Sequence, residues 1–238
     1  MIDRRAVKQM FRPLNKPERT RKQVETINTP PDYPRAIRWR MKLSESLQKD
    51  RKGSWNYFGA PLSTIENQLN FRIRKEIKQR LTRAENGKKV MVLDYGCGNA
   101  RALSELKAEF GGRIFTTGTI LKKPNPKELE KTKTPLFHDA VDRIIEGDFL
   151  TTRVPGKYDL IFSHYGPAIH GQAPVSAIEK AITMLKPGGV AAIHFLKSHL
   201  GFGEELNAML IQNGISPKDY RLVGNEVIII TKPVRKLP

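Results

Sequence analysis

The sequence predicts an α/β protein built on a mostly parallel β-sheet with helices on both faces. Short apolar runs have the length and composition of buried strands, at residues 90–95, 113–120, 144–149, 158–164 and 190–195. Helical patterns with apolar residues every three or four positions lie between some of these runs, as at 101–110 and 175–185. Near-continuous apolar strands that alternate with amphipathic helices are typical of a sheet covered on both sides.

The first strand, at residues 90–95, ends in an acid and a tight turn. Asp94 stands near its carboxyl end, and Gly96 and Gly98 follow one residue apart. Glycine permits backbone angles and close approaches that a side chain forbids. Asn99 is a suitable N-cap for the next helix, whose N-terminus offers free N–H groups to an anion. This layout predicts a site for a nucleotide-like ligand, although glycine turns also follow strands in proteins without one.

The carboxyl-terminal part continues the alternation. The helix at 175–185 stops at Leu185-Lys186-Pro187-Gly188-Gly189, which predicts a turn before the strand at 190–195. A further helix is predicted at 202–212. Two final strands, at 220–223 and 227–231, flank Gly224-Asn225 and predict a hairpin.

Residues 86–232 resemble the class I S-adenosylmethionine-dependent methyltransferases. The most specific matches are Val92-Leu93-Asp94-Tyr95-Gly96-Cys97-Gly98 and Leu185-Lys186-Pro187-Gly188-Gly189, which occur in the family's order. The resemblance implies a Rossmann-like sheet of seven strands whose last strand is antiparallel. It also implies that the chain is an enzyme with S-adenosyl-L-methionine as its cofactor.

The resemblance implies a role for individual residues at the cofactor. Asp94, Gly96 and Gly98 would border its methionine end. Asp148 would bind the adenine amine, with Phe149 beside the ring. From the residues alone, a turn cap is the less favoured alternative for Asp148, and Phe149 is more often a plain core residue.

Three further residues complete the implied cofactor site. Ser163 and His164, at the end of the strand at 158–164, would close its other side. Thr119 stands where the family usually has a ribose-binding acid, so a weaker neutral hydrogen bond replaces a charge-assisted one. This departure places cofactor affinity and turnover in question. The insertion at 122–139 is predicted to be a surface loop that could supply the missing contacts.

The loop after residue 163 carries the candidate catalytic groups His164, Tyr165 and His170. A strand end at the ligand-bearing edge is where a titratable side chain meets substrate. A structural role for His170 is an equal alternative, and His194 is predicted to be buried. The loop has no Asn-Pro-Pro-Tyr or Asp-Pro-Pro-Tyr, which makes methylation of an exocyclic base amine less favoured. One cysteine excludes both a disulfide and a cysteine-based metal cluster.

Basic residues concentrate in front of the predicted 86–238 domain. The chain has a net charge of +18, and residues 1–52 hold 15 Lys/Arg against 6 Asp/Glu. Few regular apolar positions occur in 1–52, which predicts an extended arm. Residues 53–85 contain an aromatic cluster at 54–61 and a predicted helix at 63–85. An apolar residue at every fourth position of that helix predicts packing on the domain: Ile65, Leu69, Ile73, Ile77 and Leu81.

The basic part predicts binding of RNA or a ribonucleoprotein through residues 1–85. Trp55, Tyr57 and Phe58 could stack on bases or form a lid over the cofactor. A solvated basic face and, less favoured, an anionic membrane surface are alternatives. No apolar stretch has the length of a membrane span or a signal sequence, and the single thiol favours a cytoplasmic setting.

Three functions therefore remain open. The first is a methyltransferase that acts on RNA or a ribonucleoprotein. The second is a methyltransferase for a small molecule or a protein, in which the basic arm is a lid with a solvated face. The third is a methyltransferase-like assembly factor that binds RNA or ribosomes without turnover, for which the absent acid at Thr119 is the main support.

Overall fold

A computed structural model of the chain describes residues 59–85, 87–122, 135–170, 173–195, 202–224 and 226–234. The chain divides into two units, Met1–Trp39 and Arg40–Pro238, and all described residues belong to the second. The predictions for the arm at 1–52 and for the aromatic side chains at 54–58 of the 54–61 cluster lie outside the described residues, as do positions 123–134 of the insertion.

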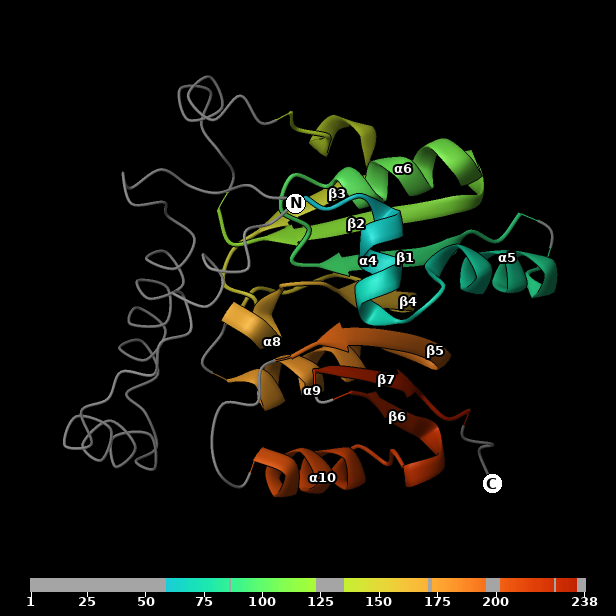
Figure 1. Cartoon of the computed structure of the whole chain (residues 1–238). Helices are drawn as coiled ribbons and strands as arrows, with labels where there is room; N and C mark the ends of the chain where they lie inside the picture. Colours follow the sequence, from blue (N-terminus) through green and yellow to red (C-terminus); the bar gives the residue numbers. More distant parts are fainter. Residues whose placement is uncertain are drawn as a thin grey trace, which may run out of the picture. The chain divides into compact units, whose positions relative to one another are not determined.

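Seven strands form one sheet in the order β3-β2-β1-β4-β5-β7-β6 (Figure 1). The central strands are parallel, and β7 alone runs against its two neighbours. The predicted sheet and its reversed last strand are therefore confirmed. The strands are β1 (Val90–Tyr95), β2 (Ile114–Ile120), β3 (Arg143–Glu146), β4 (Tyr158–Ser163), β5 (Leu185–His194), β6 (Tyr220–Val223) and β7 (Val227–Thr231).

Helices cover both faces of the sheet, and each face has its own apolar core. One core joins α9 and α10 to the strands, and the other joins α4, α5 and α6 to them. The predicted helix at 202–212 is confirmed at those residues. The helices are α4 (Leu62–Leu69), α5 (Ile73–Arg83), α6 (Arg101–Phe110), α8 (Pro167–His170), α9 (Pro174–Met184) and α10 (Phe202–Gln212), with short 3-10 turns at Gly111–Arg113, His138–Ala140 and Pro217–Asp219.

The single helix predicted for residues 63–85 is wrong, because the structure has two helices there. α4 ends at Asn70, which takes the left-handed conformation with φ of 45°. Positions four apart drift by about 40° around a helix, so Ile65 and Leu81 of one straight helix would lie about 160° apart. The break at Asn70 turns α5 so that Ile73 and Ile77 are fully buried in the core that also contains residues of α4, α6 and the sheet.

The turn predicted at residues 185–189 belongs instead to β5. α9 does end at Met184, but Leu185 already pairs with Tyr158. The register then shifts, so that Leu160 pairs with Val190. Residues 186–189 thus form an irregularity inside the strand, which the pairing of neighbours on both sides holds in place.

Candidate active site

The carboxyl end of β1 lies at the point where the order of strands reverses. β2 is on one side of β1 and β4 on the other, so the segments that follow β1 and β4 leave the sheet side by side at the same edge. Open α/β sheets bind their ligands in this position. The sequence-predicted cofactor residues gather at the ends of β1, β2, β3 and β4 along this edge.

The turn after β1 has the backbone that its glycines predict. Gly96 and Gly98 have φ of 106° and 53°, which only glycine adopts without strain. A Cβ on Gly96 would lie 2.8 Å from the Cα of Gly166, in the loop that follows β4. The two loops therefore touch through their backbones at this point.

Asn99 does not stand at the N-cap position. α6 begins at Arg101, after Ala100 with φ of 61°. The Asn99 side chain still supports the helix start, because its Oδ1 accepts the N–H of Arg101 at 3.1 Å.

Asp94 is the buried acid of the site. Its residue surface is 4% exposed, and its carboxylate has no hydrogen bond or ion pair within the part of the chain that the structure describes. Burial without a compensating partner raises its pKa from 3.8 to about 8. Burial and the nearby Asp94 also raise the pKa of the Cys97 thiol well above its usual value.

Thr119 contacts the glycine turn directly. Its hydroxyl accepts the N–H of Gly96 at 3.0 Å, and its carbonyl accepts the N–H of Cys97 at 2.9 Å. Thr119 is also almost fully buried, with 3% of its surface exposed. This hydroxyl therefore fixes the turn after β1, a role that the sequence analysis did not consider.

Asp148 follows β3 and caps its own turn. Its Oδ1 accepts the N–H of Leu150 at 3.0 Å, and both the N–H and the hydroxyl of Thr151 at 2.9 and 3.0 Å. These contacts match the turn-cap alternative for Asp148. They also give the loop a fixed shape beside the end of β2, since Gly147 N–H donates to the carbonyl of Ile120.

Two side chains from other elements hold the same loop by its carbonyls. The Tyr95 hydroxyl donates to the carbonyl of Phe149 at 2.8 Å, and the two rings meet edge to face. Lys180 of α9 donates to the carbonyls of Leu150 and Thr152 at 2.8 and 2.7 Å. The loop of residues 148–152 is thus preorganised from β1 and α9. Lys180 was not among the sequence-predicted site residues, because its place in a helical pattern gave no signal.

Ser163 connects the ends of β4 and β1. Its side chain is fully buried, and its hydroxyl donates to the carbonyl of Tyr95 at 2.6 Å. Next to it, a Cβ on Gly166 would lie 2.1 Å from the Ser163 Oγ. This hydroxyl holds the two loops together, whatever contact its position gives with a ligand.

Two of the three candidate catalytic side chains lie in one ring cluster. His164 and Tyr165 meet at 4.3 Å between centroids, and His194 stacks on His164 at 5.8 Å. Ser163 pairs with Ile193, so adjacent parallel strands bring the two histidines together. Tyr165 is 49% exposed and has φ of 52°, a rare conformation for a bulky residue. His170 is the last residue of α8, and its side chain lies outside the described residues.

Both histidines of the cluster are neutral at pH 7. Burial, assisted by His194, lowers the pKa of His164 from 6.5 to about 4. Burial also lowers the pKa of His194, although Glu226 lies 3.4 Å from its Nε2 and opposes the shift. His164 Nε2 and His194 Nδ1 are buried with no hydrogen-bond partner in the described part of the chain. Glu226 was missed, because only the β5–β7 pairing places it near His194.

The end of the 122–139 insertion packs on the glycine turn. His138 donates from Nε2 to the carbonyl of Gly98 at 2.9 Å. The Phe137 N–H donates to the carbonyl of Asn99 at 3.0 Å, and the Asn99 amide donates to the carbonyl of Pro135. The insertion therefore touches the predicted cofactor site, and His138 is a third residue that the sequence gave no reason to select.

Comparison with known proteins gives structural matches only. No protein-family model and no curated protein matches the chain. A methyltransferase from Pyrococcus furiosus is 23% identical, with 67% of this chain and 83% of that one covered and a TM-score of 0.38. An O-methyltransferase from Thermotoga maritima is 17% identical, with 74% and 72% covered and a TM-score of 0.41. An amino pentose methyltransferase from Micromonospora echinaspora, solved with S-adenosylmethionine bound, is 18% identical, with 58% of each chain covered and a TM-score of 0.36.

The fold follows from the chain's own topology. Within the described residues, no helix is long and apolar enough to cross a membrane. The seven-stranded sheet, the reversed β7 and the glycine turn after β1 are features that the sequence resemblance implied, and the structure adds the strand order 3-2-1-4-5-7-6. The chain has the fold of the class I S-adenosylmethionine-dependent methyltransferases.

Proposed function

We propose that the protein is an S-adenosylmethionine-dependent methyltransferase whose methyl acceptor is RNA or a ribonucleoprotein. The observation that supports the cofactor best is Asp94, a buried carboxyl group without a partner in the described part of the chain. A desolvated carboxylate is strongly stabilised by a cation, and an ammonium group is one. S-adenosylmethionine has an ammonium group at its methionine end, so Asp94 fits it.

The cofactor would supply an electrophilic methyl group, and the chain would supply position and a dry environment. In-line transfer depends mainly on how the acceptor is held. His164 is neutral at pH 7 and is a weak base, because its pKa is about 4. Its role in this proposal is to accept a hydrogen bond from the acceptor and so orient the acceptor's lone pair. Tyr165, half-exposed beside it, would cover the acceptor from the solvent side.

Isothermal titration calorimetry with S-adenosylmethionine tests the cofactor assignment. Asp94→Asn should weaken binding at least tenfold, because it removes the charge and keeps the shape. Since the pKa of Asp94 is about 8, binding of the cation at pH 7 should release close to one proton, visible as a buffer-dependent enthalpy. Asp139→Asn, an exposed acid beside His138, is the matched control and should bind as the unmodified chain does. A chain that binds no cofactor contradicts the proposal.

RNA is proposed as acceptor because of the basic excess in front of the fold. The chain carries +18, and residues 1–52 hold 15 Lys/Arg against 6 Asp/Glu. Such an excess is the electrostatic signature of phosphate binding. Transfer of labelled methyl groups into fractionated cell RNA, protein and metabolites tests the acceptor. Label in protein or in metabolites would replace RNA by that class.

A binding protein without turnover is the second candidate. Two observations favour it: the Thr119 hydroxyl is engaged by Gly96, and the Asp148 carboxylate by its own turn. Both groups stand where the resemblance implies cofactor contacts. The same calorimetry separates the candidates, since a binding protein would retain RNA affinity in the absence of any heat from S-adenosylmethionine.

A further inference from the structure

The basic residues of α5 and of its N-cap position, Arg72, divide into two groups. One group is paired with carboxylates: Arg74 with Glu66 and Glu109 at 2.6 and 3.0 Å, and Lys78 with Glu109 at 2.9 Å. Arg80 pairs with Glu76 at 2.7 Å and also donates to the carbonyl of Gly188. Arg74 and Lys78 hold α4, α5 and α6 together, Arg80 connects α5 to β5, and the charge of all three is largely compensated.

The other group consists of Arg72, Lys75 and Arg83, which we name the cationic stripe. All three are exposed, and none has a hydrogen bond or ion pair within the described ranges of the chain. At 100° and 1.5 Å per residue, Lys75 and Arg83 lie about 80° apart around the helix and about 12 Å apart along its axis, and Arg72 directly precedes the first turn. The stripe is therefore a single face of uncompensated charge.

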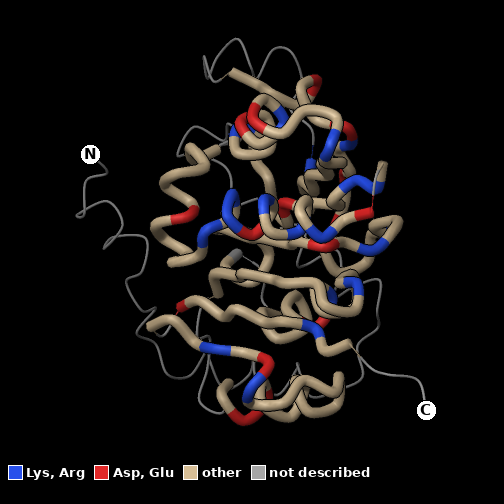
Figure 2. The backbone as a smooth tube through the Cα atoms, turned by 90° about the vertical axis from the view of Figure 1, so that its right-hand side faces the viewer, with Lys and Arg blue, Asp and Glu red and all other residues tan. Residues whose placement is uncertain are grey.

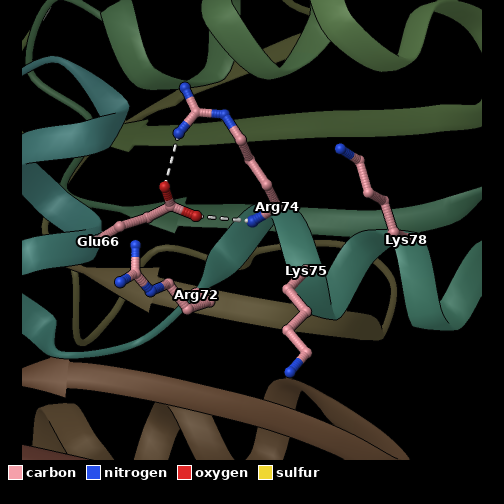
Figure 3. Close-up of a pocket in the computed structure, with 5 residues that line it drawn as sticks. All are labelled: Glu66, Arg72, Arg74, Lys75 and Lys78. Carbon is pink, nitrogen blue, oxygen red and sulfur yellow. Dashed lines mark hydrogen bonds and ion pairs between the residues drawn. The ribbon is translucent and has the colours of Figure 1, made fainter.

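Part of the stripe borders a pocket. Arg72 and Lys75, with Arg74, Lys78 and Glu66, line a hollow of about 440 Å³ (Figure 3). Glu66 faces Arg74 there, while Lys75 extends away from it. Figure 2, which faces the side of the molecule where α5 lies, shows basic and acidic positions interspersed across the middle of the view. Ion pairing with neighbouring carboxylates, and not the number of basic residues, thus decides which cations remain available to bind a ligand.

The opposite face of α5 is not available to a membrane. Ile73 and Ile77 are fully buried in the core that includes α4, α6 and the sheet. An amphipathic helix binds a bilayer by inserting its apolar face, and here that face is occupied by the protein itself. A polyanion that contacts only the charged face is the partner that remains compatible.

We propose that the cationic stripe binds the phosphate backbone of the RNA acceptor. This inference rests on the proposed function for the identity of the partner. Arg80 contacts Gly188 near the start of β5, so α5 lies at the amino ends of the strands. Asp94 lies near the other end of β1, a strand of 6 residues and about 20 Å. A partner that contacts both the stripe and the edge beside Asp94 would therefore extend along the sheet, as an oligonucleotide does.

The experiment measures binding of a fluorescent, mixed-sequence, single-stranded 20-nucleotide RNA to the full chain by anisotropy, over a range of salt concentrations. The variant Arg72→Gln/Lys75→Gln/Arg83→Gln should bind at least tenfold more weakly. Its slope of log K against log salt should fall by about 2, since each lost phosphate contact contributes about 0.7 for a single strand. A matched variant, Lys157→Gln/Lys218→Gln/Arg221→Gln, removes the same charge from exposed positions elsewhere and should lose less than threefold.

The outcomes separate this inference from the proposed function. Equal losses in the two variants, or none in the first, would overturn the stripe as a specific contact. Preferential binding to vesicles that contain phosphatidylserine would overturn RNA as the partner. The predicted loss of RNA affinity in a chain that gives no heat with S-adenosylmethionine would support the stripe and reject the methyltransferase. Urea unfolding of both variants verifies that each remains folded.

Discussion

Both carboxylate oxygens of Glu66 are bound by Arg74 across the break between α4 and α5. The Arg74 N–H donates to Glu66 Oε1 at 2.8 Å, and its guanidinium meets Oε2 at 2.6 Å. Glu66 has only 7% of its side chain exposed. Glutamate is rarely buried unless it is paired, and Arg74 is the partner that permits this burial. The contact therefore fixes the angle between two helices that the spacing of apolar residues predicted to be one.

Glu66→Gln should destabilise the fold. The change removes the charge from a buried group that accepts both a backbone N–H and a guanidinium, and hydrogen bonds to charged groups contribute about 2 kcal/mol. Urea unfolding followed by circular dichroism measures the loss. Lys88→Gln breaks an exposed pair with Glu85 and should change stability by less than about 0.5 kcal/mol. Equal effects of the two changes would argue against a structural role for Glu66.

Asp94 should make the fold less stable as the pH rises. Between pH 3.8 and about 8, the folded chain retains a proton on Asp94 that the unfolded chain releases. The free energy of unfolding should therefore fall with pH, by up to about 1.4 kcal/mol per unit from this group. In Asp94→Asn this contribution is absent. The free energy of unfolding of the variant, relative to that of the unmodified chain, should therefore rise between pH 5 and pH 8. Urea unfolding at pH 5 and pH 8 measures the change. An equal change in the free energy of unfolding for the variant and the unmodified chain would contradict the burial of an unpaired carboxyl.

Lys180 should act as a positioning residue for the loop at 148–152. Lys180→Met removes the donor to the carbonyls of Leu150 and Thr152, and should weaken S-adenosylmethionine binding about tenfold in calorimetry, about 1.4 kcal/mol. Lys180→Arg retains a donor and should restore most of the affinity. Lys157→Met removes a comparable bond, to the carbonyl of Thr183, and should have no effect on binding. Unchanged affinity in Lys180→Met would remove the loop from the cofactor site.

Gly166→Ala and Gly203→Ala should change stability in opposite directions. A Cβ at Gly166 would lie 2.2 Å from the carbonyl oxygen of Tyr95, which is backbone that cannot move aside, so a loss of about 3 kcal/mol or more is expected. Nothing lies within 4 Å of a Cβ at Gly203 in α10, where alanine should add about 0.5 to 1 kcal/mol. Thermal unfolding compares the two. A tolerated Gly166→Ala would mean that the loops after β1 and β4 separate easily.

Local sequence patterns predicted most of the helices and strands. The hairpin strands at 220–223 and 227–231 and the helix at 202–212 were predicted with the bounds that the structure has, because their periodicity and turn residues agree. The helix at 63–85 failed because its break depends on what α5 packs against, and an asparagine inside a helical pattern does not reveal that. The turn at 185–189 failed for the same reason, since pairing with β4 makes a strand of it.

The site was less accessible to sequence reasoning. Asp94, Gly96 and Gly98 could be selected from one short motif, and the structure places them together. Lys180, His138 and Glu226 reach the same edge from distant parts of the chain, and only the tertiary structure brings them there. Thr119 and Ser163 were selected for contact with a ligand, but their hydroxyls are engaged with Gly96 and Tyr95. The type of a residue at a strand end therefore predicts where its side chain lies, but not which group it hydrogen-bonds.

Cys97 gives the molecule a built-in reporter of its own opening. It is the chain's single cysteine, 4% exposed, and its raised pKa keeps the sulfur as an unreactive thiol. Disulfide reagents attack only when the segment between Asp94 and Asn99 detaches from β2. The rate at which the native protein is modified therefore measures how often this segment opens. Any compound that occupies the edge beside Asp94 should slow this rate, which permits ligands to be screened without a label or an assay of turnover.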